Sequence, residues 1–370
     1  MDLTLTSEQE LIRGSAREFV DREIAPHARD WDREETMDRA IVGKLAEIGF
    51  LAGWELDTVS YCLVMEELGR ADSSVRGIVS VNVGLVGKTI LKWGTEEQQE
   101  WVPRLGSGEV LGCYALTEPG AGSDPGSIAT RAERDGDDWT ITGSKVFITL
   151  GTWAGLALVF AKTGDAITCF LVPTDSPGFS AHAIKGKLGL RAQDTGELTL
   201  DGVRVPAENV LGEEGGGLKV ALSALDNGRI SLAAGCVGIG QGCLEACLAY
   251  AKERRQFGRA IASFQLVQEL LAEIAVETDA ARLLTWRAAL AADAGARHTL
   301  ESSIAKYYAS EASVRAANAA VQVHGGYGYI DEYPVGKYLR DARVTTLYEG
   351  TSQIQKLIIG RALTGENAFV

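Results

Sequence analysis

Histidine and cysteine, the side chains that most often bind transition metals, are scarce in this chain. Its 370 residues include four histidines and six cysteines, and no two cysteines have the C-x-x-C spacing of a zinc or redox motif. The cysteines lie in apolar surroundings, which favours buried thiols in a reducing compartment, and we therefore expect a cytoplasmic location. The sequence predicts neither a metal site nor a disulfide framework.

Positive charge is also scarce. The chain has 36 lysines and arginines and 50 aspartates and glutamates, which gives a formal net charge of -14. Nucleic acids and anionic membranes bind basic surfaces, so neither is expected as a main partner. We find no uninterrupted apolar run of membrane-spanning length, and the first ten residues lack the apolar core of a secretory signal. Apolar residues make up 46% of the chain, which is ordinary for a globular protein with a full core.

Both ends of the chain have the apolar period of helices. Residues 6–9 and 95–98 are capping boxes of the form Thr-x-x-Gln, and each predicts the start of a helix. Residues 266–284 and 299–324 have the period of long amphipathic helices rich in alanine. Such helices approach one another closely, which favours a bundle that also packs on other subunits.

The middle of the chain has the period of β-strands. We predict three hairpins around glycine turns: 139–142 with 146–149, 156–161 with 167–172, and 198–200 with 203–205. A glycine-rich joint then returns the chain to helices. We therefore expect an α+β protein of three domains, which are 1–111 (helical), 112–211 (antiparallel β) and 212–370 (helical).

Three glycine-rich stretches resemble nucleotide-binding motifs but do not meet their requirements. Residues 84–89 end like a phosphate-binding loop, yet Asn82 stands where the first glycine is needed. Residues 238–242 follow a helical pattern rather than a strand, so we interpret their glycines as helix-packing positions. Residues 212–217 have no suitably placed lysine and are interpreted as a hinge.

Glu349 is the carboxylate with the most unusual setting. It follows Leu347 and Tyr348 and precedes Gly350, so burial among apolar groups would raise its pKa. A carboxylate with a raised pKa is a useful general base near neutral pH. The local pattern alone favours the other interpretation, an ordinary acidic residue at a helix N-terminus.

Three further segments carry ligand chemistry, each with an ordinary alternative. Residues 114–124 place hydroxyl groups before a glycine turn, an arrangement that suits a phosphate or a polar heterocycle. The alternative is that this segment is a plain surface loop. Arg254, at a helix end, could bind a pyrophosphate or only complement the helix dipole. Asp226 and Arg229 lie one helical turn apart and could simply pair with each other.

Five motifs, in this order and at this spacing, resemble those of the acyl-CoA dehydrogenases: 114–124, 146–149, 253–258, 322–326 and 348–353. The resemblance covers nearly the whole chain. It implies an N-terminal helical domain, a central antiparallel β barrel or sandwich, and a C-terminal four-helix bundle. It also implies non-covalently bound FAD, conversion of an acyl-CoA to a trans-2-enoyl-CoA, an electron-transfer flavoprotein as electron acceptor, and a homotetramer built as a dimer of dimers.

The resemblance also implies roles for individual residues. Glu349 would remove the α-proton of the thioester while a hydride leaves the β-carbon for flavin N5. The positions that match FAD contacts are Tyr114, Leu116, Thr117, Gly122, Ser123, Phe147, Thr149, Arg254, Gln256, Phe257, Gln265, Gln322, Gly325, Gly326, Thr351 and Gln353. The positions that match acyl-CoA contacts are Ser123, Asp226, Arg229 and Gly350.

The chain departs from the family pattern in one place that bears on the substrate. A loop between Phe50 and Leu56 is shorter than in relatives by roughly ten residues. Gly228 stands where the isovaleryl and long-chain branch carries its base, so the chain resembles the short- and medium-chain branch. We expect Val81, Leu85 and Thr89 to line the far end of the acyl chain. A thioester on a carrier protein, an oxidase reaction with oxygen and a flavin-free scaffold of the same fold are the alternatives.

Overall fold

The computed structural model describes residues 4 to 368, and its first third is helical, as the sequence predicts. The capping boxes at Thr6 and Thr95 are both present and begin α1 and α7. A single 3-10 segment, η1 (Phe50–Glu55), joins α3 to α4, so the short connection expected there is confirmed. The helices of this part are α1 (Ser7–Glu23), α2 (Ala28–Glu34), α3 (Ile41–Glu47), α4 (Thr58–Ala71), α5 (Ser73–Val79), α6 (Lys88–Trp93), α7 (Glu96–Gln99) and α8 (Trp101–Gly106).

Between α5 and α6 the chain forms a π-helix, η2 (Ser80–Gly87), which is buried throughout. π-helical turns are rare and occur often at functional sites. Asn82, inside η2, accepts a hydrogen bond from the N–H of Gly112 (2.9 Å) and donates one to the carbonyl of Leu105 (3.1 Å). The residue that spoils the phosphate-loop motif therefore ties η2 to the first strand of the sheet.

The central part is a seven-stranded sheet of order β1-β4-β2-β3-β7-β6, with β5 paired to β4. Most neighbours are antiparallel, while β1 and β2 each pair in parallel with β4. The short 3-10 segments η3 (Pro125–Ser127) and η4 (Ala207–Asn209) flank it. The strands are β1 (Gly112–Ala115), β2 (Arg131–Asp135), β3 (Asp138–Thr149), β4 (Leu156–Thr163), β5 (Ala166–Pro173), β6 (Phe179–Ala183) and β7 (Thr195–Pro206).

Two of the three predicted hairpins are wrong. Residues 139–149 form the single strand β3, and residues 198–205 lie within the single strand β7. The glycines at 143 and 202 lie where the β3–β7 ladder shifts register between Ile141 and Gly143, so they mark a bulge rather than a chain reversal. The hairpin of 156–161 with 167–172 is confirmed as β4 and β5.

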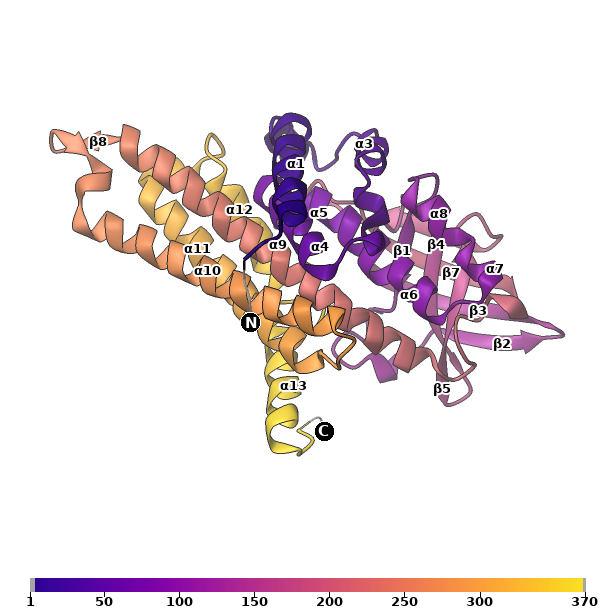
Figure 1. Cartoon of the computed structure of the whole chain (residues 1–370). Helices are drawn as coiled ribbons and strands as arrows, with labels where there is room; N and C mark the ends of the chain where they lie inside the picture. The colour runs from indigo at the N-terminus through magenta and orange to yellow at the C-terminus, as the bar shows by residue number, and fades with distance from the viewer. Residues whose placement is uncertain (1–3, 369–370) are drawn as a thin grey trace.

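The last third is a helical bundle around α9, which is 37 residues long (Figure 1). Gly238 confirms the packing interpretation, because a Cβ there would lie 2.0 Å from the carbonyl of Glu66 on α4. The elements of this part are α9 (Gly217–Glu253), β8 (Arg255–Gln256), β9 (Arg259–Ala260), η5 (Ile261–Ser263), α10 (Gln265–Asp293), α11 (Thr299–His324), η6 (Gly325–Tyr329), α12 (Val335–Thr345) and α13 (Ser352–Thr364). We keep the division into 1–111, 112–211 and 212–370 as a proposal.

Within residues 4–368, two helical stretches are long and apolar enough to cross a membrane by length and composition, although we found no such run in the sequence. They are 73–93 and Gly217–Glu253. Their most apolar windows are 89% and 67% buried inside the molecule. Burial in the core therefore accounts for their composition without a membrane.

Candidate active site

Glu349 lies in the turn between α12 and α13 rather than in the first turn of a helix. Its φ of 53° is in the left-handed region, which is uncommon for a residue with a Cβ, and Gly350 follows with φ 86°. The side-chain amide of Gln355 donates to the carbonyls of Glu349 (3.0 Å) and Gly350 (3.1 Å), and the Lys306 ammonium donates to the carbonyl of Gly350 (2.6 Å). These three hydrogen bonds hold the turn in a conformation that the backbone alone would not favour.

The carboxylate of Glu349 has the properties of a base. Its Oε2 is buried and has no hydrogen-bond partner among residues 4–368. Burial raises the pKa of Glu349 above its usual range, while the charges of Arg76, Lys306 and Arg229 partly offset that rise. The side chain therefore combines a free acceptor atom with a pKa moved toward neutral pH.

Glu349 faces a cavity formed between the helical parts and the sheet. The predicted residues that meet there are Tyr114, Leu116, Thr117, Gly122, Phe147, Thr149, Glu349 and Gly350. Val81 and Leu85 of η2 line the same cavity. Thr89 is not among the residues that line it, and its buried hydroxyl donates to the carbonyl of Leu85 (2.6 Å), so its contact with the acyl chain stays a prediction.

Phe147 gives this cavity a wall suited to a flat aromatic ligand. The register shift between Lys145 and Ile148 takes Phe147 out of the β3 ladder, with φ 60° and 68% of its surface exposed. The backbone of Phe147 is strained and its aromatic ring is exposed to solvent. A flat ligand stacked on that ring would cover it. Beside it, Thr149 accepts from the amide of Gln193 (3.1 Å), whose own Oε1 is buried without a partner in the described chain. These residues fit the isoalloxazine ring of the expected FAD.

Lys145 supports the turn that follows β1, although the sequence suggested that it belonged to a hairpin turn. It is fully buried, and its ammonium donates to Glu118 Oε1 (2.8 Å) and to the carbonyls of Leu116 (3.1 Å) and Phe160 (2.7 Å). Glu118 also accepts from the N–H of Thr130 (3.0 Å). One buried ion pair thus fixes the loop that presents Leu116 and Thr117 to the cavity.

Asp226 and Arg229 pair with each other, as the simpler interpretation proposed. Arg229 Nη1 lies 2.7 Å from Asp226 Oδ1, and the hydroxyl of Thr299 donates to Asp226 Oδ2 (2.7 Å). Arg229 is buried, and its positive charge lowers the pKa of Glu349. Ser123 is exposed on the loop after Gly122.

A second group of predicted residues lies elsewhere. Arg254, Gln256, Gly325 and Gly326 line a separate cavity at the β8 end of α9, whereas the sheet lies at the opposite end of the molecule (Figure 1). Phe257, at the tip of the β8–β9 hairpin, is 93% exposed. The remaining positions join neither cavity: Gln265 and Gln353 are exposed, Gln322 lies on α11, and Thr351 caps α13 by accepting from the N–H of Ile354.

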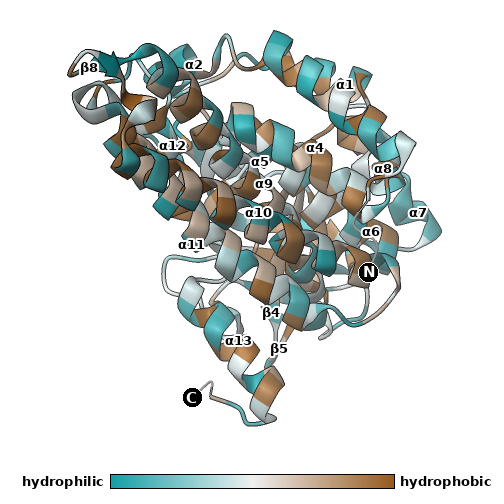
Figure 2. Ribbon diagram, turned by 60° about the vertical axis from the view of Figure 1, so that its left-hand side comes forward, coloured by the Kyte–Doolittle hydropathy of each residue, from teal (hydrophilic) through white to brown (hydrophobic). Residues whose placement is uncertain are grey.

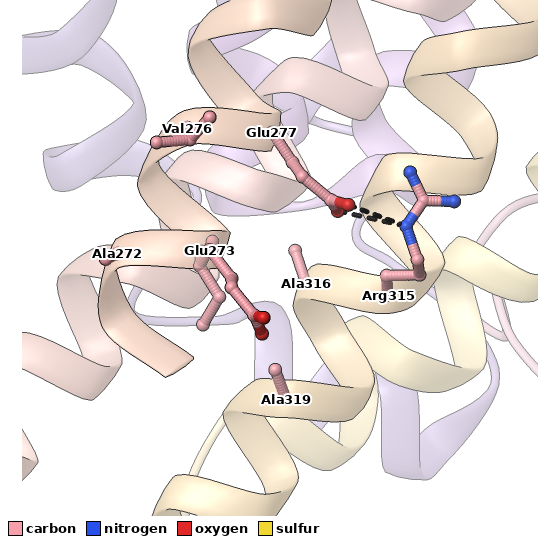
Figure 3. Close-up of a pocket in the computed structure, with 8 residues that line it drawn as sticks. Ala272, Glu273, Val276, Glu277, Arg315, Ala316 and Ala319 are labelled. Atoms are coloured by element: carbon pink, nitrogen blue, oxygen red, sulfur yellow. Dashed lines mark hydrogen bonds and ion pairs between the residues drawn. The ribbon is translucent and has the colours of Figure 1, made fainter. Parts of the chain in front are cut away.

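A further groove lies between α10 and α11 and is lined by no predicted site residue (Figure 3). Alanines line it, and Arg315 Nε donates to both carboxylate oxygens of Glu277 across it (2.8 and 3.1 Å). The other carboxylate that lines the groove, Glu273, is exposed, unlike the buried carboxylate of Glu349. The chemistry of the molecule is therefore concentrated in the Glu349 cavity.

Sequence reasoning missed Arg76, Lys306 and Gln193. Arg76 and Gln193 line the Glu349 cavity, and Lys306 contacts its floor at Gly350. Arg76 was detectable, since it is the charged residue of the otherwise apolar and small-residue stretch 73–87. Lys306 and Gln193 come from segments distant in sequence, and no local pattern marks them.

Gly228 makes room for the Glu349 carboxylate, which gives a first testable prediction. A Cβ at position 228 would lie 2.4 Å from Glu349 Oε2 and 2.9 Å from Leu85 Cδ2. The flexible carboxylate can move aside, so we expect Gly228→Ala to fold. A misplaced reacting group costs on the order of 10²-fold in rate, and we expect kcat to fall by that order.

Steady-state kinetics and thermal unfolding of Gly228→Ala check this prediction, with Gly14→Ala as the control because a Cβ at Gly14 meets open space. Unchanged kcat in a folded Gly228→Ala protein would contradict the placement of the carboxylate.

The chain is similar to known proteins over nearly its whole length. The profile described as acyl-CoA dehydrogenase, N-terminal domain, matches residues 6–109. Those for the middle and C-terminal domains of acyl-CoA dehydrogenase match residues 113–203 and 215–364.

Curated proteins and solved structures are similar over nearly their full lengths. Probable acyl-CoA dehydrogenase YngJ of Bacillus subtilis is 43% identical, with 98% of this chain and 100% of that protein covered. The mitochondrial short-chain specific acyl-CoA dehydrogenase of Mus musculus is 41% identical, with 96% and 90% covered.

Three solved structures bear on the ligands. Butyryl-CoA dehydrogenase from Megasphaera elsdenii has a TM-score of 0.96 at 37% identity, with 98% of this chain and 100% of that chain covered. A glutaryl-CoA dehydrogenase from Mycobacterium smegmatis in complex with FADH2 has a TM-score of 0.96 at 37% identity, with 99% and 97% covered. The prolyl acyl carrier protein oxidase AnaB has a TM-score of 0.94 at 31% identity, with 98% and 100% covered.

Proposed function

The chain belongs to the acyl-CoA dehydrogenase family, and we propose that it is an oxidoreductase that uses FAD to introduce a trans α,β double bond into an acyl-CoA thioester. The observation that carries the proposal is the Glu349 carboxylate, with its free, buried Oε2 and raised pKa, facing a cavity with an exposed aromatic wall. Among residues 4–368, no other carboxylate lines that cavity.

In this proposal Glu349 Oε2 accepts the α-proton of the thioester. The proton is weakly acidic, so charge that develops on the thioester carbonyl has to be stabilised as the proton leaves. We assign that role to the backbone N–H of Glu349, at the same turn. Lys306 and Gln355 hold the turn in place, and the cations around Glu349 favour its ionised form, which is the form that accepts a proton.

FAD, when bound, supplies an acceptor for the hydride that leaves the β-carbon. Tyr114, Leu116, Thr117, Phe147 and Thr149 would hold its ring in the cavity. The second cluster, around Arg254 and Gly325, lines a separate cavity that shares no residue with the ring site and lies near β8, at the other end of the molecule from the sheet (Figure 1). We propose that it binds the adenine dinucleotide of a neighbouring subunit.

That assignment requires an oligomer, and we propose a homotetramer. Helix α13 supports it, because it extends away from the body with apolar residues along its surface (Figure 2), and Leu363 is 73% exposed. We further propose an electron-transfer flavoprotein as electron acceptor, because the chain resembles the family that uses one. We propose a cytoplasmic location because the six cysteines, all within the described residues, form no disulfide.

Product analysis tests the proposed reaction directly. Purified holoenzyme, an acyl-CoA and an artificial electron acceptor should yield a thioester two hydrogens lighter, identified by mass spectrometry. Intact substrate after incubation with every acyl-CoA tried, straight, branched and aromatic, would refute the proposal.

A carrier-protein thioester is the second candidate substrate. The direct η1 connection between α3 and α4 leaves out the longer loop expected on the substrate side, and AnaB, by its name, acts on a prolyl acyl carrier protein. Comparing one acyl group on CoA and on a carrier protein separates the candidates. Turnover of the carrier-bound form alone would select the second.

The pH dependence of the reaction should report Glu349. The base acts when ionised, so kcat/KM should fall as pH is lowered through the raised pKa of Glu349. The charge of Lys306 lowers that pKa, so Lys306→Met should move the acidic limb of the profile to higher pH. A pH profile of kcat/KM checks this, with the exposed Lys252→Met as control. A limb that stays in place or moves to lower pH would contradict the assignment.

The solved relatives act, by their names, on a neutral acyl group (butyryl) and on a carboxyl-terminated one (glutaryl). The acyl group of the substrate that this protein accepts has to be inferred from the residues that line its own cavity.

A further inference from the structure

Arg76 is a buried arginine without a carboxylate partner. Three arginines are buried within residues 4–368, and the other two are paired: Arg70 with Glu67 (2.6 Å) and Arg229 with Asp226 (2.7 Å). Arg76 Nη2 donates to the hydroxyl of Tyr348 (2.9 Å), whereas its Nη1 is buried with no hydrogen-bond partner in the described chain. A buried guanidinium left in this state is costly unless a ligand completes it.

The carboxylates near Arg76 are already committed. Asp72, one turn earlier, caps α5 by accepting from the N–H groups of Ser74 and Val75, and it pairs with Lys337 (2.9 Å). Glu349 interacts with Arg76 through its charge, and the same carboxylate also interacts with the charges of Lys306 and of Arg229, which is already paired with Asp226. Two buried cations, Arg76 and Lys306, therefore share the single carboxylate that has to work as a base.

The chain is shaped to place Arg76 at the cavity wall. On α9, a Cβ at Gly235 would lie 2.2 Å from Arg76 Cδ, so glycine is needed there to admit the arginine side chain. Arg76 lines the same cavity as Glu349, and Val81, Leu85 and Leu225 form apolar wall near it. The cavity thus has a base, an apolar stretch and an incompletely bonded guanidinium.

We propose that the acyl chain of the substrate ends in a carboxylate, which Arg76 binds. The substrate class is then a monothioester of a short dicarboxylic acid. The proposal rests on the dehydrogenase function and names its substrate. The free Nη1 donates to the carboxylate, and the guanidinium fork matches the geometry of its two oxygens. The Tyr348 hydroxyl, already bonded to Nη2, helps to orient the fork, and the apolar wall contacts the methylene groups between the two ends.

A binding experiment without turnover tests this assignment. FAD-loaded Glu349→Gln is titrated with ω-carboxyacyl-CoA thioesters of graded length, with their neutral methyl esters, and with unsubstituted acyl-CoAs of matched length. Perturbation of the flavin absorbance gives each dissociation constant. We expect the carboxylate form to bind more tightly than its methyl ester by on the order of tenfold to a hundredfold, as for hydrogen bonds to charged groups.

The same titrations in an added Arg76→Gln background should remove that preference, and Arg76→Lys should retain part of it. Arg104→Gln, at an exposed arginine of α8, serves as the matched control and should keep the ratio unchanged. The methyl-ester comparison needs no change at Arg76, so it holds even if Arg76→Gln does not fold.

Equal binding of the carboxylate and its methyl ester would overturn the proposal, as would a preference that survives Arg76→Gln. If Arg76 acts only on the charge of Glu349, Arg76→Gln should shift the pH profile of the Glu349-containing enzyme and leave the substrate ratio unchanged. Reduction of the wild-type flavin by neutral acyl-CoAs alone would leave the dehydrogenase function standing and refute this inference. Failure of every thioester to perturb or reduce the flavin would instead refute the function itself.

Discussion

Glu349→Gln should retain the fold and the FAD but lose dehydrogenation. Glutamine has nearly the same shape, and the hydrogen bonds that hold the turn involve the backbone carbonyls of residues 349 and 350, which remain. The amide cannot accept the α-proton, so the rate of flavin reduction should fall by on the order of 10² to 10⁴-fold, the range for loss of a general base. Stopped-flow spectroscopy under anaerobic conditions measures that rate.

Glu332→Gln, an exposed change elsewhere on the surface, is the control and should leave flavin reduction as in the wild type. Flavin content and thermal unfolding of both variants separate catalysis from folding. A Glu349→Gln protein that contains FAD and reduces it at the wild-type rate would show that another group removes the proton.

Lys145→Met should cause the largest loss of stability among the changes considered. The ammonium is fully buried and bonded to Glu118 and two carbonyls, so methionine leaves Glu118 as a buried charge without its cation. Removing one partner of a buried ion pair costs about 3–5 kcal/mol. We expect the free energy of unfolding to drop by that amount, measured by urea denaturation of the apoprotein. FAD affinity should fall as well, because the loop with Leu116 and Thr117 loses its support.

The double variant Lys145→Met/Glu118→Gln should recover part of that loss, because the uncompensated carboxylate is gone while a carbonyl oxygen remains for the N–H of Thr130. Arg204→Met, which removes an exposed ion pair of the same sheet, should have a much smaller effect. Equal small effects for Lys145→Met and Arg204→Met would contradict the structural role of the buried pair.

The helices were predictable because their signals are local. The capping boxes at Thr6 and Thr95, and the apolar period of α10 and α11, depend on residues within a few turns of one another. The strands were harder. Gly143 and Gly202 sit among alternating residues like hairpin turns, yet the β3–β7 pairing makes them parts of a bulge. Only the partner strand distinguishes a bulge from a turn, and the local sequence does not contain it.

The candidate site was predictable in part for the same reason. Glu349 and the strand segment around Tyr114 belong to motifs that are continuous in sequence, and the structure brings them to one cavity. Lys306 and Gln193 reach that cavity from distant elements, and their role follows only from the tertiary structure. The charge of Arg76 within an apolar stretch was visible in the sequence, but the unpartnered Nη1 of Arg76 became visible only when the surrounding side chains were placed.

Anaerobic addition of thioester to the FAD-loaded wild-type protein tests the central claim most directly. Glu349 removes the α-proton as the hydride reaches the flavin, so the account predicts that the oxidised flavin absorbance bleaches and that one enoyl thioester forms per flavin reduced. The prediction extends to ω-carboxyacyl thioesters as the fastest class. A protein that takes up no FAD, or one whose bound FAD stays oxidised with every CoA- and carrier-bound thioester, would contradict it.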